Sequence, residues 1–321
     1  MKVLGKSLLL NSFIAMALVM AGGLYSCGPQ HTNLRADLLP SETAADEHER
    51  LGDVYLNQGK FQVALVEYEK SLQLDPDNTR VRYKKGSLFV VGKMYEDAIR
   101  EFEKVLKREP GHALAHQGLG RVFFQLKNYD DAKKHLRKAL RLNPKLWVAH
   151  NLLGIIYDYQ GDYKGAIRQF KVAISLESDN GLLYNNLGLS YSLIGDYEEA
   201  IKTFKEALRN TTAHPKIYNN LGLVLSKVGR YQLALEAFRK GGDEAQALNN
   251  IGCVYLQRGD RVKAIRAFEK AIESKPTYYI KAGENLKKAK MNHVYEQSFD
   301  PDWKPSDPDW KPFLGTDSGK G

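Results

Sequence analysis

Residues 184–204 read YNNLGLSYSLIGDYEEAIKTF. In this stretch Ala200 follows Gly188 by twelve residues, and Phe204 follows Ala200 by four. The same three-residue frame recurs along most of the chain. Its glycines are Gly52, Gly86, Gly120, Gly154, Gly188, Gly222 and Gly252, spaced by 34 residues except for a last interval of 30. A fixed period of this length indicates a stack of similar structural units.

The rest of the frame supplies the expected core. The alanines are Ala64, Ala98, Ala132, Ala166, Ala200, Ala234 and Ala264, and the large apolar residues are Tyr68, Phe102, Leu136, Phe170, Phe204, Phe238 and Phe268. Small residues on two short helices let the helices approach closely, but one such pair cannot bury its apolar face alone. We therefore predict an all-α fold, a right-handed superhelical solenoid of seven helix-turn-helix repeats over residues 45–278.

Prolines and glycines mark the ends of the second helices. Proline clashes in a helix interior, and four of the repeats end at a proline. These prolines are Pro76, Pro110, Pro144 and Pro276. The sixth repeat is four residues short and ends in Gly241-Gly242, which should tighten that junction. A solenoid needs a terminal cap with a polar outer face, and residues 279–297 are expected to form this capping helix.

The frame resembles the consensus of the tetratricopeptide repeat (TPR) and matches it seven times. The resemblance implies a binding scaffold without catalytic activity. No phosphate-binding loop, dinucleotide fingerprint, zinc-protease motif or nucleophile elbow occurs in the sequence. No cysteine or carboxylate accompanies His112 and His116 to complete a set of metal ligands. Cys253 is expected to serve as a small apolar residue. We expect no enzyme activity, no metal and no cofactor.

The first 26 residues have the layout of a secretory signal peptide. Lys2 and Lys6 precede an apolar stretch over residues 8–20. The following Leu24-Tyr-Ser-Cys27 resembles a bacterial lipobox, which implies lipidation of Cys27 and cleavage before it. The alternatives are an uncleaved membrane anchor, for which the apolar stretch falls short of the ~20 residues of a full span, and ordinary secretion.

A lipobox implies a membrane-held protein. Residues 27–44 would form a lipidated, flexible tether, because they are polar, contain two prolines and show no apolar period. Gly28 occupies the position at which enterobacterial lipoproteins of the inner membrane carry Asp. We therefore expect the protein in the cell envelope, at the outer membrane and facing the periplasm.

Asparagines precede the frame glycines of repeats four to seven. They are Asn151, Asn185, Asn186, Asn219, Asn220, Asn249 and Asn250. Asparagine is a poor residue in a helix interior, and a carboxamide offers both a donor and an acceptor to a peptide backbone. The series resembles the asparagine ladder in the TPR superhelix of nucleocytoplasmic glycosyltransferases, which implies a peptide-binding groove. The alternative is that one asparagine of each pair bonds the neighbouring repeat and is structural.

The C-terminal segment, residues 298–321, contains the hexapeptide Asp-Pro-Asp-Trp-Lys-Pro twice, at a seven-residue interval. Its proline density forbids a helix, so we predict a disordered tail. Trp303 and Trp310 resemble the aromatic anchors of protein interfaces and are predicted to dock a partner. A tail folded onto its own solenoid and a solubility tail are the alternatives.

Charge narrows the class of partner. Cations exceed anions by nine, but they spread along the chain, so no nucleic acid is expected. The chaperone-binding carboxylate clamp of other TPR proteins needs lysines and asparagines at set positions. Those slots hold Glu49, Asp53 and Lys84 here, so chaperone tails are not the expected ligand.

Residues 181–289 and the lipobox together resemble the TPR lipoprotein of tight-adherence (Tad, Flp-type) pilus systems, the TadD family. The residues that carry the likeness are the Asn-Asn-(Leu/Ile)-Gly series, Arg258-Gly-Asp260 and Glu284-Asn-Leu286. The resemblance implies partners in envelope complexes such as the pilus secretion machinery. Two other functions stay open: an adaptor for peptidoglycan-remodelling enzymes, and an uncleaved, inner-membrane-anchored TPR regulator. Nothing in the sequence indicates the oligomeric state.

Overall fold

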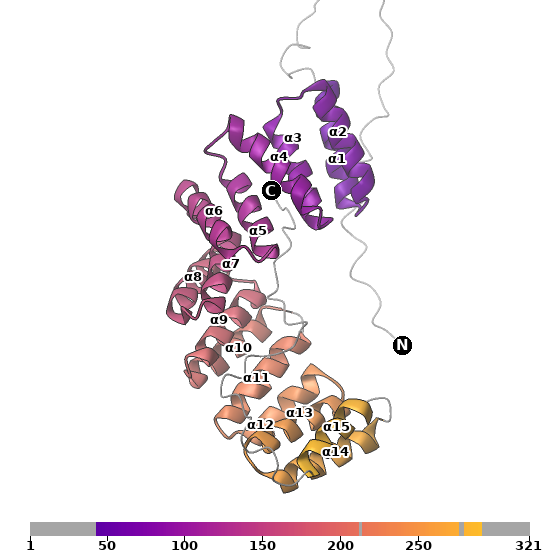
Figure 1. The fold of residues 1–321 in the computed structure, drawn as a ribbon, viewed down its shortest axis with the longest axis vertical. Coiled ribbons are helices and arrows are strands. Elements are labelled where there is room, and N and C mark those ends of the chain that lie inside the picture. The colour runs from indigo at the N-terminus through magenta and orange to yellow at the C-terminus, as the bar shows by residue number, and fades with distance from the viewer. Residues whose placement is uncertain (1–42, 212–213, 276–278, 291–321) are drawn as a thin grey trace, which may run out of the picture. The chain divides into compact units, whose positions relative to one another are not determined.

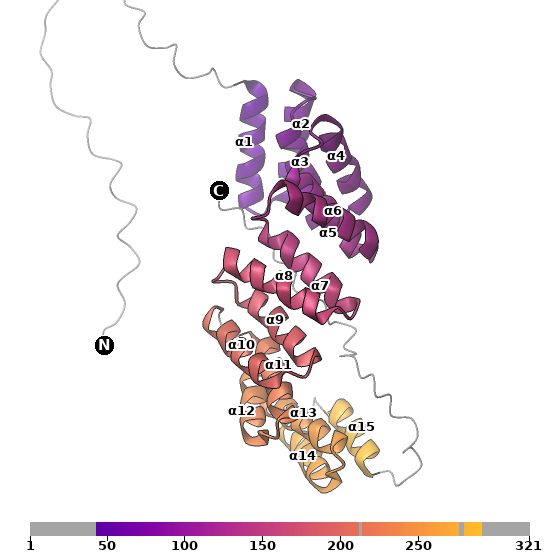
Figure 2. The same cartoon turned by 90° about the vertical axis from the view of Figure 1, so that its left-hand side faces the viewer.

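The computed structural model of the chain describes residues 43–211, 214–275 and 279–290. These residues form fifteen α-helices and no strand, in a unit that begins at Ala44 (Figures 1 and 2). The helices are α1 (Ala44–Asn57), α2 (Phe61–Leu74), α3 (Thr79–Val91), α4 (Tyr95–Arg108), α5 (Ala113–Gln125), α6 (Tyr129–Leu142), α7 (Trp147–Tyr159), α8 (Tyr163–Leu176), α9 (Gly181–Leu193), α10 (Tyr197–Arg209), α11 (Pro215–Lys227), α12 (Tyr231–Gly241), α13 (Glu244–Gln257), α14 (Arg261–Ser274) and α15 (Tyr279–Lys290).

Helices α1 to α14 form seven helix-turn-helix pairs, and α15 packs on the last pair. We call the odd-numbered helices α1 to α13 the first helices and their even-numbered partners the second helices. The predicted all-α fold of seven repeats and a C-terminal capping helix is confirmed. Residues 291–297 of the predicted cap lie outside the described residues, as does most of the range predicted to be signal and tether. No helix in the described part of the chain is both long and apolar enough to cross a membrane.

Six of the seven frame glycines make room for the aromatic ring of their own repeat, and Gly120 makes room for Leu136. A Cβ atom added at Gly154 would lie 2.6 Å from the Phe170 ring, and one at Gly222 would lie 2.6 Å from the Phe238 ring. Both rings are fully or almost fully buried. Any larger residue at these positions would push the ring out of the layer between the two helices, so the close helix packing depends on glycine.

Each turn between a first and a second helix contains one residue with positive φ, seven residues after the frame glycine. Five of these residues are glycines, namely Gly59, Gly161, Gly195, Gly229 and Gly259, with φ between 72° and 80°. The other two are Lys93 and Lys127, each with φ of 59°. The left-handed region favours glycine because a Cβ atom strains it. Both lysine turns therefore carry local strain.

The shortened sixth repeat shortens its second helix. Helix α12 has 11 residues, whereas α14 has 14. Only Gly242 and Asp243 then separate α12 from α13, and the Asp243 side chain accepts a hydrogen bond from the Gln246 backbone N–H at 2.8 Å. The predicted tight junction is thus present.

Candidate peptide-binding surface

Side-chain amides join successive first helices. Asn186 Nδ2 on α9 donates to Asn151 Oδ1 on α7 at 3.0 Å, and Asn220 Nδ2 on α11 donates to Asn185 Oδ1 on α9 at 2.9 Å. Within α9, Asn185 Nδ2 lies 3.5 Å from Asn186 Oδ1. These three contacts make a continuous row of amides across α7, α9 and α11.

The capping helix makes a similar amide bond, separate from this row. Asn285 Nδ2 on α15 donates to Asn249 Oδ1 on α13 at 2.9 Å, two repeats beyond the bond between α9 and α11. Sequence reasoning missed Asn285 as a partner in this bond. Its position 36 residues after Asn249 was the available signal, because the other bonds join residues 35 apart.

The asparagines divide into buried and half-buried members. Asn151, Asn186 and Asn249 are at most 5% exposed, so their amides serve other asparagines and are closed to a large ligand. Asn185, Asn219, Asn220 and Asn250 are half-buried. The buried asparagines therefore bond neighbouring repeats, as the structural alternative holds. Contact with a peptide remains a prediction for the half-buried asparagines.

The row is interrupted at the shortened repeat. Asn219 Oδ1 on α11 is buried and has no hydrogen-bond partner among the described residues. By the register of the other repeats, Asn219 Oδ1 would accept a hydrogen bond from Asn250 on α13. These two residues are 31 apart in the sequence, whereas the bonded pairs of the row are 35 apart. A Cβ atom at Gly241 would lie 2.7 Å from Asn219 Oδ1. The short junction has displaced the partner helix, at a cost of roughly 1–3 kcal/mol for one unpaired buried acceptor.

Ion pairs take the place of amides at the N-terminal end. Lys84 Nζ on α3 donates to Glu49 Oε1 at 2.7 Å and to Asp53 Oδ2 at 2.6 Å, both on α1. Glu49 also accepts from Arg80 Nη2 at 2.6 Å. In the slots of a carboxylate clamp, Lys84 is thus bonded to two carboxylates, which leaves it unavailable to a peptide carboxylate.

A carboxylate with one hydrogen-bond donor lies beside the amide row. Ser190 Oγ on α9 lies 2.8 and 3.0 Å from the two carboxylate oxygens of Asp158 on α7. Burial raises the pKa of Asp158 to about 7, and the bond from the Ser190 hydroxyl acts against this rise. Sequence reasoning did not single out Asp158, since its burial depends on α9.

Exposed apolar side chains accompany these polar groups on the first helices. Val91, Tyr159 and Leu193 are the last residues of α3, α7 and α9, and they are 52%, 43% and 47% exposed. Leu223 on α11 is 38% exposed. The first helices therefore carry both half-buried amides and exposed apolar side chains, a combination suited to an extended protein segment.

The remaining polar candidates have local roles. His112 caps α5 by accepting from the Ala115 N–H at 3.0 Å, and His116 Nδ1 lies 3.1 Å from His135 Nδ1. Burial lowers the pKa of His116 and His135 and raises that of the Cys253 thiol. Within the described ranges no three His, Cys, Asp or Glu side chains are grouped to hold a metal.

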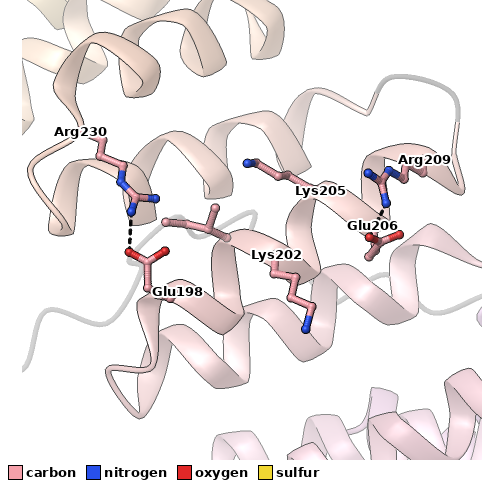
Figure 3. A pocket seen from close by; sticks show the side chains of 7 residues that line it. Glu198, Lys202, Lys205, Glu206, Arg209 and Arg230 are labelled. Carbon is pink, nitrogen blue, oxygen red and sulfur yellow. Dashed lines mark hydrogen bonds and ion pairs between the residues drawn. The ribbon is translucent and has the colours of Figure 1, made fainter.

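A hollow on the second helices offers no comparable site. It encloses about 250 Å³ along α10 and is lined by Lys202, Lys205 and five further residues (Figure 3). Arg230 pairs with Glu198 at 2.8 Å, and Arg209 pairs with Glu206 at 2.5 Å. Small-molecule sites are larger and mostly apolar, so this charged hollow does not resemble one.

Cys27, Trp303 and Trp310 lie outside the described residues. The lipidation and tail-docking predictions therefore stay predictions.

Models of the tetratricopeptide repeat match the chain at residues 45–78, 92–155, 148–180, 182–210, 215–241 and 245–278. Together these matches cover nearly all of the seven helix pairs. The chain belongs to the tetratricopeptide-repeat family. TPR families are typically interaction scaffolds without catalytic activity.

Solved TPR structures share this fold. The C-terminal part of a TPR protein from Cytophaga hutchinsonii is 15% identical, with a TM-score of 0.56 over 74% of this chain and 98% of that chain. A chain of the APC/C hetero-tetramer Cut9-Hcn1 is 23% identical, with a TM-score of 0.56 over 77% of this chain and 48% of that chain. Pseudomonas aeruginosa pilF is 22% identical, with a TM-score of 0.52 over 67% of this chain and 98% of that chain. At these identities the likeness concerns the fold alone.

A curated relative matches a short part of the TPR chain. The Hsp70-Hsp90 organising protein of Plasmodium falciparum (isolate 3D7) is 33% identical over 57 residues, which are 18% of this chain. The match spans a tenth of the length of that relative.

Proposed function

We propose that this TPR chain is a lipid-anchored scaffold of the cell envelope that binds an extended segment of a partner protein on its first helices. The observation that carries the proposal is the row of side-chain amides across α7, α9 and α11, three helices that also carry exposed apolar side chains. Half-buried amides bond a peptide backbone whatever its sequence. Each such bond nets only ~1 kcal/mol, so the apolar neighbours must supply most of the affinity.

Chaperone tails are not the proposed ligand, despite the likeness to the Hsp70-Hsp90 organising protein. Recognition of a terminal carboxylate needs free cations, and Lys84 already bonds Glu49 and Asp53. The proposed partners are instead proteins of an envelope complex. In its narrowest form, supported by the sequence resemblance to the TadD family, the proposal is that the protein assists assembly of a Tad/Flp-type pilus or secretion complex.

Site-specific crosslinking in the source cells tests the binding surface and identifies the partner. A photo-crosslinking residue in place of Leu193 on α9 should capture one envelope protein. The same residue in place of Lys205, on the second helix α10, is the matched control and should not capture it. Capture of a secretin or pilus ATPase would support the pilus function, and capture of a cell-wall enzyme would support the adaptor. Identical products from both positions would refute a specific surface on the first helices.

Anchoring is tested separately. Cys27→Ala should release the protein from membranes or leave the precursor uncleaved, because lipidation needs the thiol. One acyl chain anchors only marginally, so stable anchoring needs further chains on the cysteine. Mature, membrane-bound protein in this variant would show that the anchor lies elsewhere.

A further inference from the structure

Asp158 and Ser190 continue the seam that the asparagines form between α7 and α9. Asp158 follows Asn151 by seven residues on α7, and Ser190 follows Asn186 by four on α9, so each pair shares one face of its helix. The Asn186–Asn151 and Ser190–Asp158 bonds therefore join the same two helices side by side. Ser190 is fully buried, and its single hydroxyl proton can serve only one carboxylate oxygen at a time.

The half-buried Asp158 on α7 differs from the buried carboxylates of Glu49 on α1 and Glu101 on α4, which have cationic partners. Glu49 bonds Arg80 and Lys84, and Glu101 accepts from Arg82 Nη1 and from Lys104 Nζ, both at 3.1 Å. For Asp158, only burial and the Ser190 hydroxyl shift the pKa; no cationic side chain of the described residues contributes. A carboxylate withdrawn from water without a counter-charge is costly. In the folded protein this cost appears as the raised pKa of Asp158.

The surroundings of Asp158 fit a long basic side chain. Leu193 lies about one turn after Ser190 on α9 and is 47% exposed, and Tyr159, the residue after Asp158, is 43% exposed with its ring stacked on Tyr129. Lys and Arg bury their aliphatic stems along apolar surface while the charged head reaches a polar partner. An isolated carboxylate is no metal site, in keeping with the lack of a three-ligand group within the described ranges.

We propose that Asp158 receives a lysine or arginine side chain of the protein segment bound to the first helices, and that Ser190 holds the carboxylate in position. This inference rests on the proposed function and adds the chemistry of the partner: an extended segment with one basic residue. A charge-assisted bond from an ammonium or guanidinium group is about twice as strong as a neutral one. Because Asp158 is already half-buried, binding removes less water from its carboxylate than it would from an exposed one.

A random twelve-residue peptide display library, selected against the full chain, tests the inference. Wild-type protein should enrich peptides with Lys or Arg at one position. Asp158→Asn keeps an acceptor for Ser190 and removes the charge, so it should lose that preference. Asp53→Asn is the matched control, because Asp53 is already bonded to Lys84, and it should keep the preference. For one selected peptide, replacing its basic residue by Gln should weaken binding about tenfold to wild type and much less to Asp158→Asn.

A charge reversal at Asp158 predicts a new preference, so its result cannot be confused with a general loss of binding. Asp158→Lys should shift the selection toward peptides with Asp or Glu. Peptides enriched without any basic preference, or with a preference that survives in Asp158→Asn, would overturn the inference and leave the proposed function standing. The Ser190–Asp158 bond would then be one more link between repeats. If wild-type protein enriches no peptide at all, the proposed function fails, and this inference fails with it.

Discussion

At the scale of single residues, the turns between paired helices show how one backbone position can lower the stability of a repeat. All seven turns use the left-handed region, and two of them place a lysine there. The strain of a side chain in this region, about 1–2 kcal/mol, exceeds the entropy that glycine loses on folding, about 0.5–1 kcal/mol. Lys93→Gly and Lys127→Gly should each stabilise the protein by about 0.5–1 kcal/mol in urea denaturation.

The reverse change is the control for these turns. A Cβ atom at Gly161 would meet no atom within 4 Å, so Gly161→Ala tests the backbone alone and should destabilise by a similar amount. Stability that is unchanged by all three substitutions would mean that the turns relax at no cost.

The carboxyl group of Asp158 should make stability depend on pH in a definite direction. Burial raises its folded-state pKa to about 7 from an ordinary 3.8. The stabilisation by the bound proton is therefore complete below about pH 4 and is lost as the pH rises to about 7. Asp158→Asn has no carboxyl group to ionise, so its stability relative to wild type should increase between about pH 4 and pH 8, by up to about 4 kcal/mol at about 1.4 kcal/mol for each pKa unit. A constant difference between the two proteins over that range would contradict the buried state of Asp158.

At the scale of the helices, the amide bonds act as staples between repeats. Asn186→Ala would leave the buried Oδ1 of Asn151 without a donor, at a cost of about 1–3 kcal/mol. The matched control is Asn250→Ala, because the Asn250 side chain is half-buried and makes no hydrogen bond to another described residue; this substitution should cost less than about 0.5 kcal/mol. The coupling between Asn151→Ala and Asn186→Ala in a double-mutant cycle measures the staple directly. Independent effects of the two substitutions would show that the bond contributes nothing.

The sequence pattern predicted these helices well because it depends on local spacing. The spacing of Gly154, Ala166 and Phe170 indicates one helix pair, and the same spacing recurs in every repeat. The pattern could not show which asparagines are buried, since that depends on the offset between repeats that only packing determines. Asp158 escaped notice for the same reason: its burial is created by α9, and a lone aspartate in a sequence resembles a solvated one.

At the scale of the whole solenoid, stability is a sum of repeats and of the interfaces between them, so each end needs a cover. Helix α15 provides it at the C-terminal end. Its Ala282 and Ala289 are buried, Ala282 against Leu248 and Ala271, and Ala289 against Ala264 and Phe268. Asn285 also supplies the only donor recorded for the buried Asn249 Oδ1 within the described part of the chain.

Two truncations separate the cap from the tail. Deletion from Thr277 onward removes α15, which uncovers the Phe268 ring and leaves Asn249 Oδ1 unpaired. Exposing one aromatic side chain costs about 1.5–3 kcal/mol, and an unpaired buried acceptor costs a similar amount, so this protein should melt several degrees lower or aggregate. Deletion from Phe299 onward keeps α15 and should leave the melting temperature unchanged. Calorimetry of both truncated chains against the full chain decides the matter. An equal fall for both would mean that the stabilising contacts come from residues 299–321, and the cap would then be the wrong explanation of how the solenoid ends.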